Sequence, residues 1–184
     1  MRGFRVGAHR NQRVAEGDGI LWVDDSKATN AHAAQASLAA YPSVVWIAGG
    51  LLKGIDPEPL VERHAARLRA AVLIGADRSA LRAAFARHAP AVTLVEVEAT
   101  ETGEVMPTAV RAAALLAQAG DAVLLAPAAA SMDQFTDYAD RGTRFAQAGD
   151  AVLLAPAAAS FDQFDDYADR GDRFARAVRE LLEP

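Results

Sequence analysis

The sequence contains no cysteine, and this absence excludes a disulfide framework, a thiolate metal site and a thiol nucleophile. It also fits a reducing compartment. Basic residues are fewer than acidic ones, which gives a formal net charge of -5 at pH 7, and no basic stripe with interleaved aromatic residues occurs. A nucleic-acid-binding surface is therefore not expected.

Long apolar runs are also absent. The longest apolar region, residues 112–130, is interrupted by Gln118, Gly120 and Asp121, so we do not expect it to cross a bilayer. The N-terminus lacks the apolar core of a signal peptide. With 184 residues, 52% of them hydrophobic and 23% charged, the composition is that of a globular domain. We expect one compact domain in the cytoplasm, without membrane contact.

The sequence does contain a regular alternation of short apolar runs and alanine-rich segments with helical spacing. The runs predict strands at 20–24, 44–48, 71–75, 92–97 and 122–126, and the segments between them predict helices at 29–40, 57–69, 78–88 and 107–118. Ser26 or Thr29 and Asp77 or Ser79 are available as helix caps, and Pro57 and Pro107 suit a first helical turn. This βα alternation predicts an α/β fold, a Rossmann-like three-layer domain with a mostly parallel sheet.

The first 19 residues show no clear period and carry four arginines. We interpret residues 1–19 as a linker or strand that comes from a preceding domain, and residues 20–184 as the domain itself.

The C-terminal third contains a tandem duplication. Residues 117–145 repeat as 146–174, and three of the 29 pairs differ, which leaves 26 identical positions. The differing pairs are Met132/Phe161, Thr136/Asp165 and Thr143/Asp172. Two units appended to a non-repeating domain do not make a solenoid, so we interpret them as a recent or engineered duplication of a strand-loop-helix segment.

The duplication creates a conflict within the predicted sheet. Each copy encodes a wholly apolar strand, 122–126 or 151–155, followed by a loop and a helix that begins near Asp133 or Asp162. Such a strand belongs in the interior of a sheet, where one position accepts one strand. The sequence leaves open which copy takes that position. The other copy could be a looped-out insertion, a helical extension or an extra edge strand, and an edge strand would favour association.

Three polar turns follow predicted strands at the edge where open α/β sheets bind ligands. The stretch Asp24-Asp25-Ser26-Lys27-Ala28-Thr29-Asn30 combines carboxylates, an ammonium, hydroxyls and an amide directly after a buried strand. Lys53 follows a Gly-Gly turn whose N–H groups can face an anion. Ser131, or Ser160 in the second copy, precedes Asp-Gln-Phe at a predicted helix start, which is a typical anion site. Each residue alone could be an ordinary cap or a solvated turn residue. Their convergence on one edge favours a binding site.

These motifs carry a resemblance to a known family. The motifs are DSKATN, His9-Arg10 upstream of it, Gly49-Gly50-Leu51-Leu52-Lys53-Gly54 downstream of it, and a series of Ser, Asp-Gln-Phe and Arg-Gly that occurs twice. Together they resemble the C-terminal domain of the Mur ligases that join D-glutamate to UDP-N-acetylmuramoyl-L-alanine. The resemblance implies that D-glutamate carboxylates are held by Thr29, Lys53, Ser131 or Ser160, and Tyr138 or Tyr167.

The resemblance also implies a nucleotide-facing group made of Arg10, Asp25 and Lys27, with Lys27 in a catalytic role. In such ligases ATP, with Mg²⁺, phosphorylates the substrate carboxylate, and the amine of D-glutamate attacks the acyl phosphate. No G-x-x-x-x-G-K-[ST] motif occurs in this chain, so we expect ATP and UDP-N-acetylmuramoyl-L-alanine to be bound through other domains and the isolated chain to be inactive. Two alternatives stay open: a catalytically inactive fragment altered by the duplication, or a related Mur or folylpolyglutamate-type ligase.

The four histidines show no paired metal-ligand spacing, so we expect no metal site. His64 and His88 are predicted to lie on charged helical faces. Only His9, next to Arg10, is a candidate for a role near the site.

Overall fold

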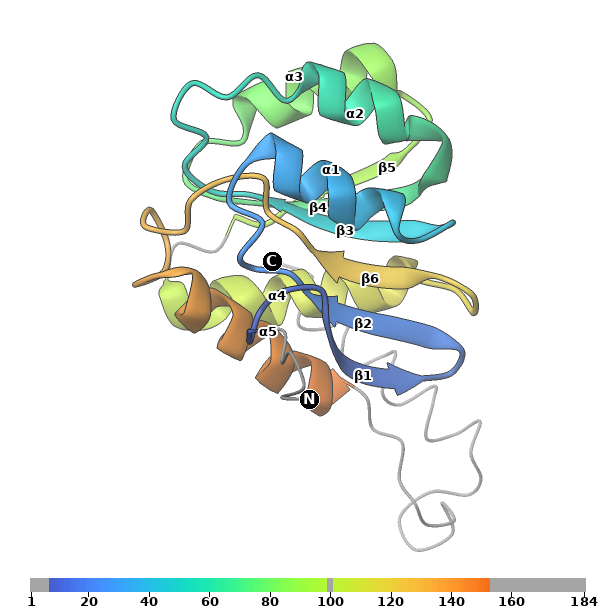
Figure 1. Cartoon of the computed structure of the whole chain (residues 1–184), viewed down its shortest axis with the longest axis vertical. Coiled ribbons are helices and arrows are strands. Elements are labelled where there is room, and N and C mark those ends of the chain that lie inside the picture. The colour runs from blue at the N-terminus through green and yellow to red at the C-terminus, as the bar shows by residue number, and fades with distance from the viewer. Residues whose placement is uncertain (1–6, 99–100, 153–184) are drawn as a thin grey trace, which may run out of the picture. The chain divides into compact units, whose positions relative to one another are not determined.

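Six strands form one mixed sheet with the order β1-β2-β6-β3-β4-β5 in a computed structural model that describes residues 7–98 and 101–152 (Figure 1). The strands are β1 (Gln12–Gly17), β2 (Ile20–Asp24), β3 (Val44–Gly49), β4 (Leu68–Ile74), β5 (Thr93–Glu96) and β6 (Ala122–Leu125). β1 pairs antiparallel with β2, and all the other pairs are parallel. The carboxyl ends of five strands therefore meet at one edge.

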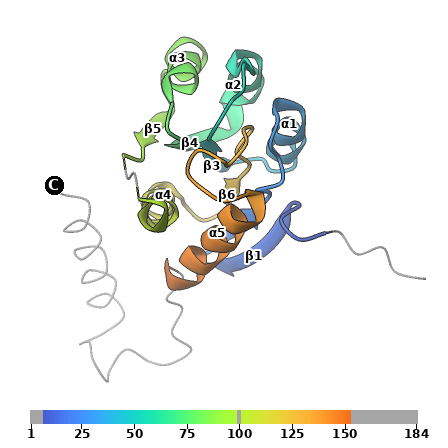
Figure 2. The ribbon, with the colours of Figure 1, turned by 90° about the vertical axis from the view of Figure 1, so that its left-hand side faces the viewer.

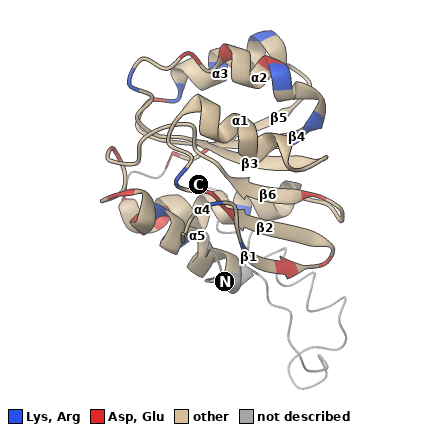
Figure 3. Cartoon of the chain, viewed as in Figure 1, with Lys and Arg blue, Asp and Glu red and all other residues tan. Residues whose placement is uncertain are grey.

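Helices cover both faces of the sheet and make three layers (Figure 2). The helices are α1 (Ala31–Ala39), α2 (Glu58–His64), the 3-10 turn η1 (Ala65–Arg67), α3 (Ser79–His88), α4 (Thr102–Leu116) and α5 (Tyr138–Val152). Alternate residues of β3 point to opposite layers: Val44 and Trp46 pack with α1, α2 and α3, whereas Val45 and Ile47 pack with α4. Because β3 and β6 are covered on both faces, neither carries a charged residue (Figure 3). The predicted fold class is confirmed.

Several predicted boundaries were wrong for identifiable reasons. Asn30, rather than Ser26 or Thr29, caps α1 by accepting a hydrogen bond from the backbone N–H of Ala33. The predicted helix 57–69 ends early, since β4 already begins at Leu68. Helix α4 begins at Thr102, so Pro107 lies inside the helix and not in its first turn.

The helix expected to begin near Asp133 begins at Tyr138. Residues 131–137 form turns instead, and the Ser131 carbonyl accepts hydrogen bonds from the backbone N–H groups of Gln134 and Phe135. Ser131 is therefore not at a helix N-terminus, and the prediction of a helix start next to it was wrong.

The segment before residue 20 contributes an edge strand to the sheet. Residues 12–17 are β1, whose register runs from Gln12 opposite Asp24 to Gly17 opposite Ile20. The preceding loop carries His9, which returns over the end of β2.

The first repeat copy occupies the interior position of the sheet. Its strand β6 lies between β2 and β3, with Val123 opposite Trp22 on one side and Val45 on the other. The first seven residues of the second copy, Ala146–Val152, continue helix α5, so the strand expected from residue 151 is helical at its first two positions. Residues 153–174 of the second copy lie outside the described residues.

Candidate functional site

Three loops lie side by side at the carboxyl edge of the parallel strands. Loop 25–30 follows β2, loop 50–57 follows β3 and loop 126–137 follows β6. The N–H of Ala128 donates to the carbonyl of Ala28 at 2.9 Å, and Leu51 and Ala130 exchange backbone hydrogen bonds of 2.8 and 3.1 Å. These bonds tie the loop after β6 to both of its neighbours.

Glycine is required where the second and third loops meet. Gly50 has a φ of 124°, and a Cβ there would collide with the carbonyl oxygen of Ala130 and lie 3.4 Å from Nη1 of Arg141. A side chain at this position would push the Leu51–Ala130 pair apart. The glycine pair before Lys53 therefore allows close backbone contact between loops.

Buried polar groups fix the loop after β2. Asp24 is 1% exposed; its Oδ2 lies 2.6 Å from Nδ1 of His9, and its Oδ1 accepts a hydrogen bond of 2.9 Å from the N–H of Ser26. Asp25 accepts a hydrogen bond from Oγ of Ser37 on α1. Each carboxylate therefore holds its own loop to a neighbouring segment, although the sequence analysis gave Asp24 no role of its own within the polar stretch.

Arg141 of α5 is fully buried and joins two of the loops. Its Nε donates to Oγ of Ser26 at 2.9 Å, its Nη2 to the carbonyl of Ser26 at 2.8 Å and its Nη1 to the carbonyl of Ala129 at 3.2 Å. Burial lowers the pKa of the guanidinium to about 10, against the favourable charges of Asp133 and Asp24, so it stays protonated at neutral pH. The Arg-Gly motif in the sequence was the signal for this residue.

An aromatic and a cationic side chain stack beside Asp24. Nζ of Lys27 lies 3.5 Å from the centroid of the Tyr138 ring, which is a cation–π contact. The ring of His9 meets the same tyrosine edge-on, at 6.3 Å between centroids. The N–H of Lys27 also donates to the carbonyl of His9. Lys27, Tyr138 and His9 thus form one cluster at the end of β2.

The three residues of the predicted nucleotide-facing group line one hollow. This hollow, of about 360 Å³, lies between the loop before β1, loop 25–30 and α1, and is lined by Arg10, Asn11, Asp25, Lys27, Ala28, Ala33, Ala36 and Ser37. Two cationic side chains from different segments therefore border the same space.

The residues predicted to hold D-glutamate come from all three loops. Thr29 is partly buried in loop 25–30, and Lys53 is exposed in loop 50–57 with a φ of 53°. Ser131 is buried, and Tyr138 is the first residue of α5. Ser160 and Tyr167, their equivalents in the second copy, lie outside the described residues.

Asp133 and Gln134 hold a fourth loop, which the sequence analysis did not connect to the site. Oδ2 of Asp133 accepts a hydrogen bond of 2.9 Å from the N–H of Ala76, and Oε1 of Gln134 accepts one of 2.6 Å from the N–H of Gly75. These two side chains fix the turn after β4 against the turn that carries Ser131. Within the Ser-x-Asp-Gln-Phe motif, these two side chains therefore bind the backbone N–H groups of the turn after β4.

Of the two histidines predicted to lie on charged helical faces, His88 does so and His64 does not. His64 is 3% exposed, so its assignment to a charged helical face was wrong. His88 is partly buried and lies 3.3 Å from Oε2 of Glu58. Within residues 7–98 and 101–152, no group of three or more potential ligand side chains is arranged to hold a metal ion.

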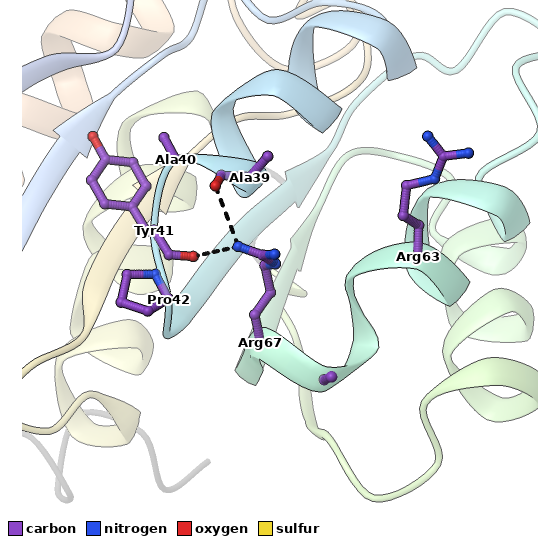
Figure 4. A pocket seen from close by; sticks show the side chains of 7 residues that line it. Ala39, Ala40, Tyr41, Pro42, Arg63 and Arg67 are labelled. Atoms are coloured by element: carbon purple, nitrogen blue, oxygen red, sulfur yellow. Dashed lines mark hydrogen bonds between the residues drawn. The ribbon is translucent and has the colours of Figure 1, made fainter.

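A second hollow, of about 460 Å³, lies at the opposite end of α1, beside Tyr41, Arg63 and Arg67 (Figure 4). Nη1 of Arg67 donates to the carbonyls of Leu38, Ala39 and Tyr41 at 3.3, 3.4 and 2.8 Å. Arg67 therefore binds the end of α1, where backbone carbonyls disfavour an anion. In the part of the chain that the structure describes, no helix has the length and hydropathy needed to span a bilayer.

The chain is similar in sequence to a known protein family and to several of its members. The family model described as "Mur ligase, glutamate ligase domain" matches residues 9–129. The chain is 68% identical over 142 residues to the UDP-N-acetylmuramoylalanine–D-glutamate ligase of Leifsonia xyli subsp. xyli. This match covers 77% of this chain and 28% of that relative. The chain is also 60% and 62% identical, over 145 residues each, to the enzymes of the same name from Streptomyces avermitilis and Thermobifida fusca. Each match covers 79% of this chain and 31% of the relative. The chain thus spans under a third of the length of these relatives.

Proposed function

Because the chain belongs to the family of Mur ligase glutamate ligase domains, we propose that it is the amino-acid-binding part of an ATP-dependent ligase that joins D-glutamate to UDP-N-acetylmuramoyl-L-alanine in peptidoglycan synthesis. The observation that carries the proposal is the joining of the loops with Thr29, Lys53 and Ser131 by backbone hydrogen bonds at one sheet edge. The names of its relatives favour D-glutamate over another amino acid. A cytoplasmic location goes with this assignment, and a preceding domain would connect ahead of β1.

In this proposal the three loops fix the two carboxylates of D-glutamate. The ammonium of Lys53 supplies a point charge, the hydroxyls of Thr29 and Ser131 donate hydrogen bonds, and Tyr138 closes the pocket. Fixing both carboxylates leaves the amine free to attack, so the contribution of this domain is proximity and orientation. Ser160 and Tyr167 would replace Ser131 and Tyr138 if the second copy formed the site.

The hollow lined by Arg10, Asp25 and Lys27 would face the ribose and phosphates of ATP held by another domain. Lys27 is the proposed catalytic residue, because its ammonium can stabilise negative charge that develops as the acyl phosphate forms and is attacked. Mg²⁺ would enter with ATP. Since the described residues contain no cluster of metal ligands, we assign it no ligand in this chain.

Titration of the isotope-labelled chain with D-glutamate tests the binding site. We expect amide shifts at Thr29, Lys53 and Ser131 with D-glutamate and not with L-glutamate. Equal or larger shifts with L-glutamate would favour a related ligase that adds another amino acid.

A chimera tests the complete reaction if the isolated chain does not bind. The chain replaces the matching segment of the Leifsonia xyli relative, and phosphate release from ATP is measured with UDP-N-acetylmuramoyl-L-alanine and D-glutamate. Activity that requires D-glutamate supports the proposal, and a folded chimera without activity contradicts it.

Substitution of Lys53 in this chimera tests its assigned role. We expect Lys53→Ala to raise the KM for D-glutamate roughly 10- to 100-fold, because a hydrogen bond to a charged group contributes about 1.5–3 kcal/mol. The KM for ATP should stay constant. Arg87→Ala is the matched control, since Arg87 pairs with Glu58 on the surface between α3 and α2. An unchanged KM for D-glutamate would remove Lys53 from the site.

A further inference from the structure

We propose that Arg141 is a positioning residue that sets the place of the Lys27 ammonium; this rests on the proposed function insofar as Lys27 acts in catalysis. Arg141 has no exposed surface, so it does not touch a substrate. Its contacts are instead with the backbone and hydroxyl directly before Lys27.

The guanidinium fixes the peptide unit from which Lys27 projects. Nη2 binds the carbonyl of Ser26, which is the oxygen of the peptide bond to Lys27, and Nε binds Oγ of the same serine. That hydroxyl in turn donates to the carbonyl of Tyr138 at 2.7 Å. One buried cation thereby fixes both partners of the Lys27–Tyr138 stack relative to each other.

The third bond extends the same control to the loop after β6. Nη1 donates to the carbonyl of Ala129, two residues before Ser131. The planar fork presents its donors at fixed angles, which an ammonium on a flexible chain does not. Lysine at position 141 would keep the charge and lose this geometry.

The test compares Arg141→Met with Arg144→Met, both in a chain that also carries Arg170→Met so that the second copy offers no replacement. Arg144 lies on the same helix and pairs with Asp140 at the surface, so its substitution removes the same charge without touching the loops. The readout is the upfield NMR shift that the Tyr138 ring gives the methylene protons of Lys27 next to Nζ. We expect Arg141→Met to abolish this shift and Arg144→Met to keep it.

A purely structural role predicts a different result. In that case Arg141→Met lowers the unfolding temperature while folded molecules keep the Lys27 shift, and the proposal is overturned. If Arg141→Met does not fold, Ser26→Ala removes the hydroxyl between Arg141 and Tyr138 and should reduce the shift in a folded chain; an unchanged shift overturns the proposal. D-glutamate titration of the parent chain is separate, so its failure would affect the function and not the positioning role.

We also infer that the second repeat copy can replace the first in the interior of the sheet. The evidence is where the two copies differ: Met132 is 72% exposed, and Thr136 and Thr143 are exposed as well. Every buried residue of the first copy from Ala122 to Phe145 has an identical counterpart in the second. The sheet and loops therefore cannot distinguish the copies by contact.

The same short sequence already adopts two conformations within the described chain. Residues 117–123, Ala-Gln-Ala-Gly-Asp-Ala-Val, leave α4, turn and enter β6. Residues 146–152 have the identical sequence and form the end of α5. Local sequence thus permits the segment to change from helix to turn and strand.

We call the form in which the second copy lies in the interior of the sheet the exchanged form. Two opposing effects set its population. Exchange lengthens the five-residue connection between α4 and the interior strand by 29 residues, which lowers its population about twentyfold by loop-closure entropy. In return, the helix would continue through Val178 and Arg179 in place of Gly149 and Asp150, and replacing glycine by valine in a helix interior favours the exchanged form about twofold. The exchanged form should therefore hold roughly one molecule in ten.

Cysteine pairs test the exchange cleanly because the chain has no cysteine of its own. Leu51 and Ala130 form a hydrogen-bonded antiparallel pair, whose Cα atoms lie about 5.5 Å apart, within disulfide range. Leu51→Cys with Ala130→Cys reports the first copy, and Leu51→Cys with Ala159→Cys reports the second copy in the same place. Leu51→Cys with Ala157→Cys is the control for random collision, since position 157 corresponds to position 128.

We expect the 51–159 disulfide to form about ten times more slowly than the 51–130 disulfide and faster than the 51–157 disulfide. Adding Arg141→Met should speed the 51–159 reaction, because it weakens only the first copy. Formation no faster than the 51–157 control overturns the proposal, as does a 51–159 disulfide found only in covalent dimers.

Discussion

At the residue scale, His64 is a buried titratable side chain in the layer of α1, α2 and α3. It lies at the end of α2, 3% exposed, and among the described residues neither of its ring nitrogens has a hydrogen-bond partner. Burial, together with the charges of Arg67 and Arg63, lowers its pKa below the ordinary value of 6.5. The folded protein therefore holds this imidazole neutral at a pH where the unfolded chain protonates it.

This imbalance predicts a loss of stability on the acid side. As the pH falls below about 6.5, the unfolded state binds a proton that the folded state does not, so stability present at pH 7 is progressively lost. His64→Leu should be more stable than the parent by about 1 kcal/mol at pH 7, since it removes an unpaired buried polar group. Its advantage should grow by up to about 1.4 kcal/mol per pH unit below pH 6. Urea unfolding at pH 7 and pH 5 measures both effects.

His32→Leu is the matched control because His32 is exposed on α1. It should change the stability difference between pH 7 and pH 5 very little. A parent protein and a His64→Leu variant with the same pH dependence would show that His64 titrates normally in the folded chain.

At the scale of elements, α5 docks on β2 through a glycine. A Cβ at Gly142 would collide with Nδ1 of His9 and lie 2.6 Å from Oδ2 of Asp24, which are the two atoms of the His9–Asp24 hydrogen bond. A Cβ at Gly149, two turns later, would lie 3.9 Å from Cε3 of Trp22, which is an ordinary contact. Close packing therefore requires glycine at position 142, whereas position 149 of the same helix has room for a side chain.

The two alanine variants should change stability in opposite directions. Gly149→Ala should stabilise the fold by about 0.5–1 kcal/mol, the difference in helix propensity. Gly142→Ala should destabilise it by about 1–3 kcal/mol despite the same gain, because the added methyl overpacks the contact with His9 and Asp24. Thermal unfolding of both variants measures this contrast. Stabilisation by Gly142→Ala would mean that α5 does not pack on β2 as described.

Sequence patterns predicted those helices and strands that are determined by their own residues and not by contacts with distant ones. The apolar strands 20–24 and 44–48 are observed within one residue of their predicted bounds, because both faces of each are covered. The start of α5 was missed, since Asp133 and Gln134 resemble a helical first turn but use their side chains on the loop after β4. The pairings of Arg141 with Ser26 and of His9 with Asp24 join residues far apart in the sequence. No local pattern contains such contacts.

At the scale of the whole molecule, the sequence could not say which copy enters the sheet. The three differences lie at exposed positions of the first copy, so they carry little packing energy. Chain connection is what separates the copies, because α4 reaches β6 through only five residues. The shorter connection favours the first copy by closure entropy.

Deleting residues 146–174 tests whether the second copy matters to the folded core. Phe145 is then joined to Ala175, and α5 continues into Arg176, Ala177 and Val178 instead of Gln147, Ala148 and Gly149. Every described contact of β6 and of α5 up to Phe145 is retained, and Gly149 is replaced within the helix by valine. We expect the shortened chain to fold with the same sheet and to be more stable by up to about 0.5 kcal/mol, because valine has a higher helix propensity than glycine. Amide hydrogen exchange of β6 and thermal unfolding measure the two expectations, and an unfolded or less stable product would show that the second copy supports the core.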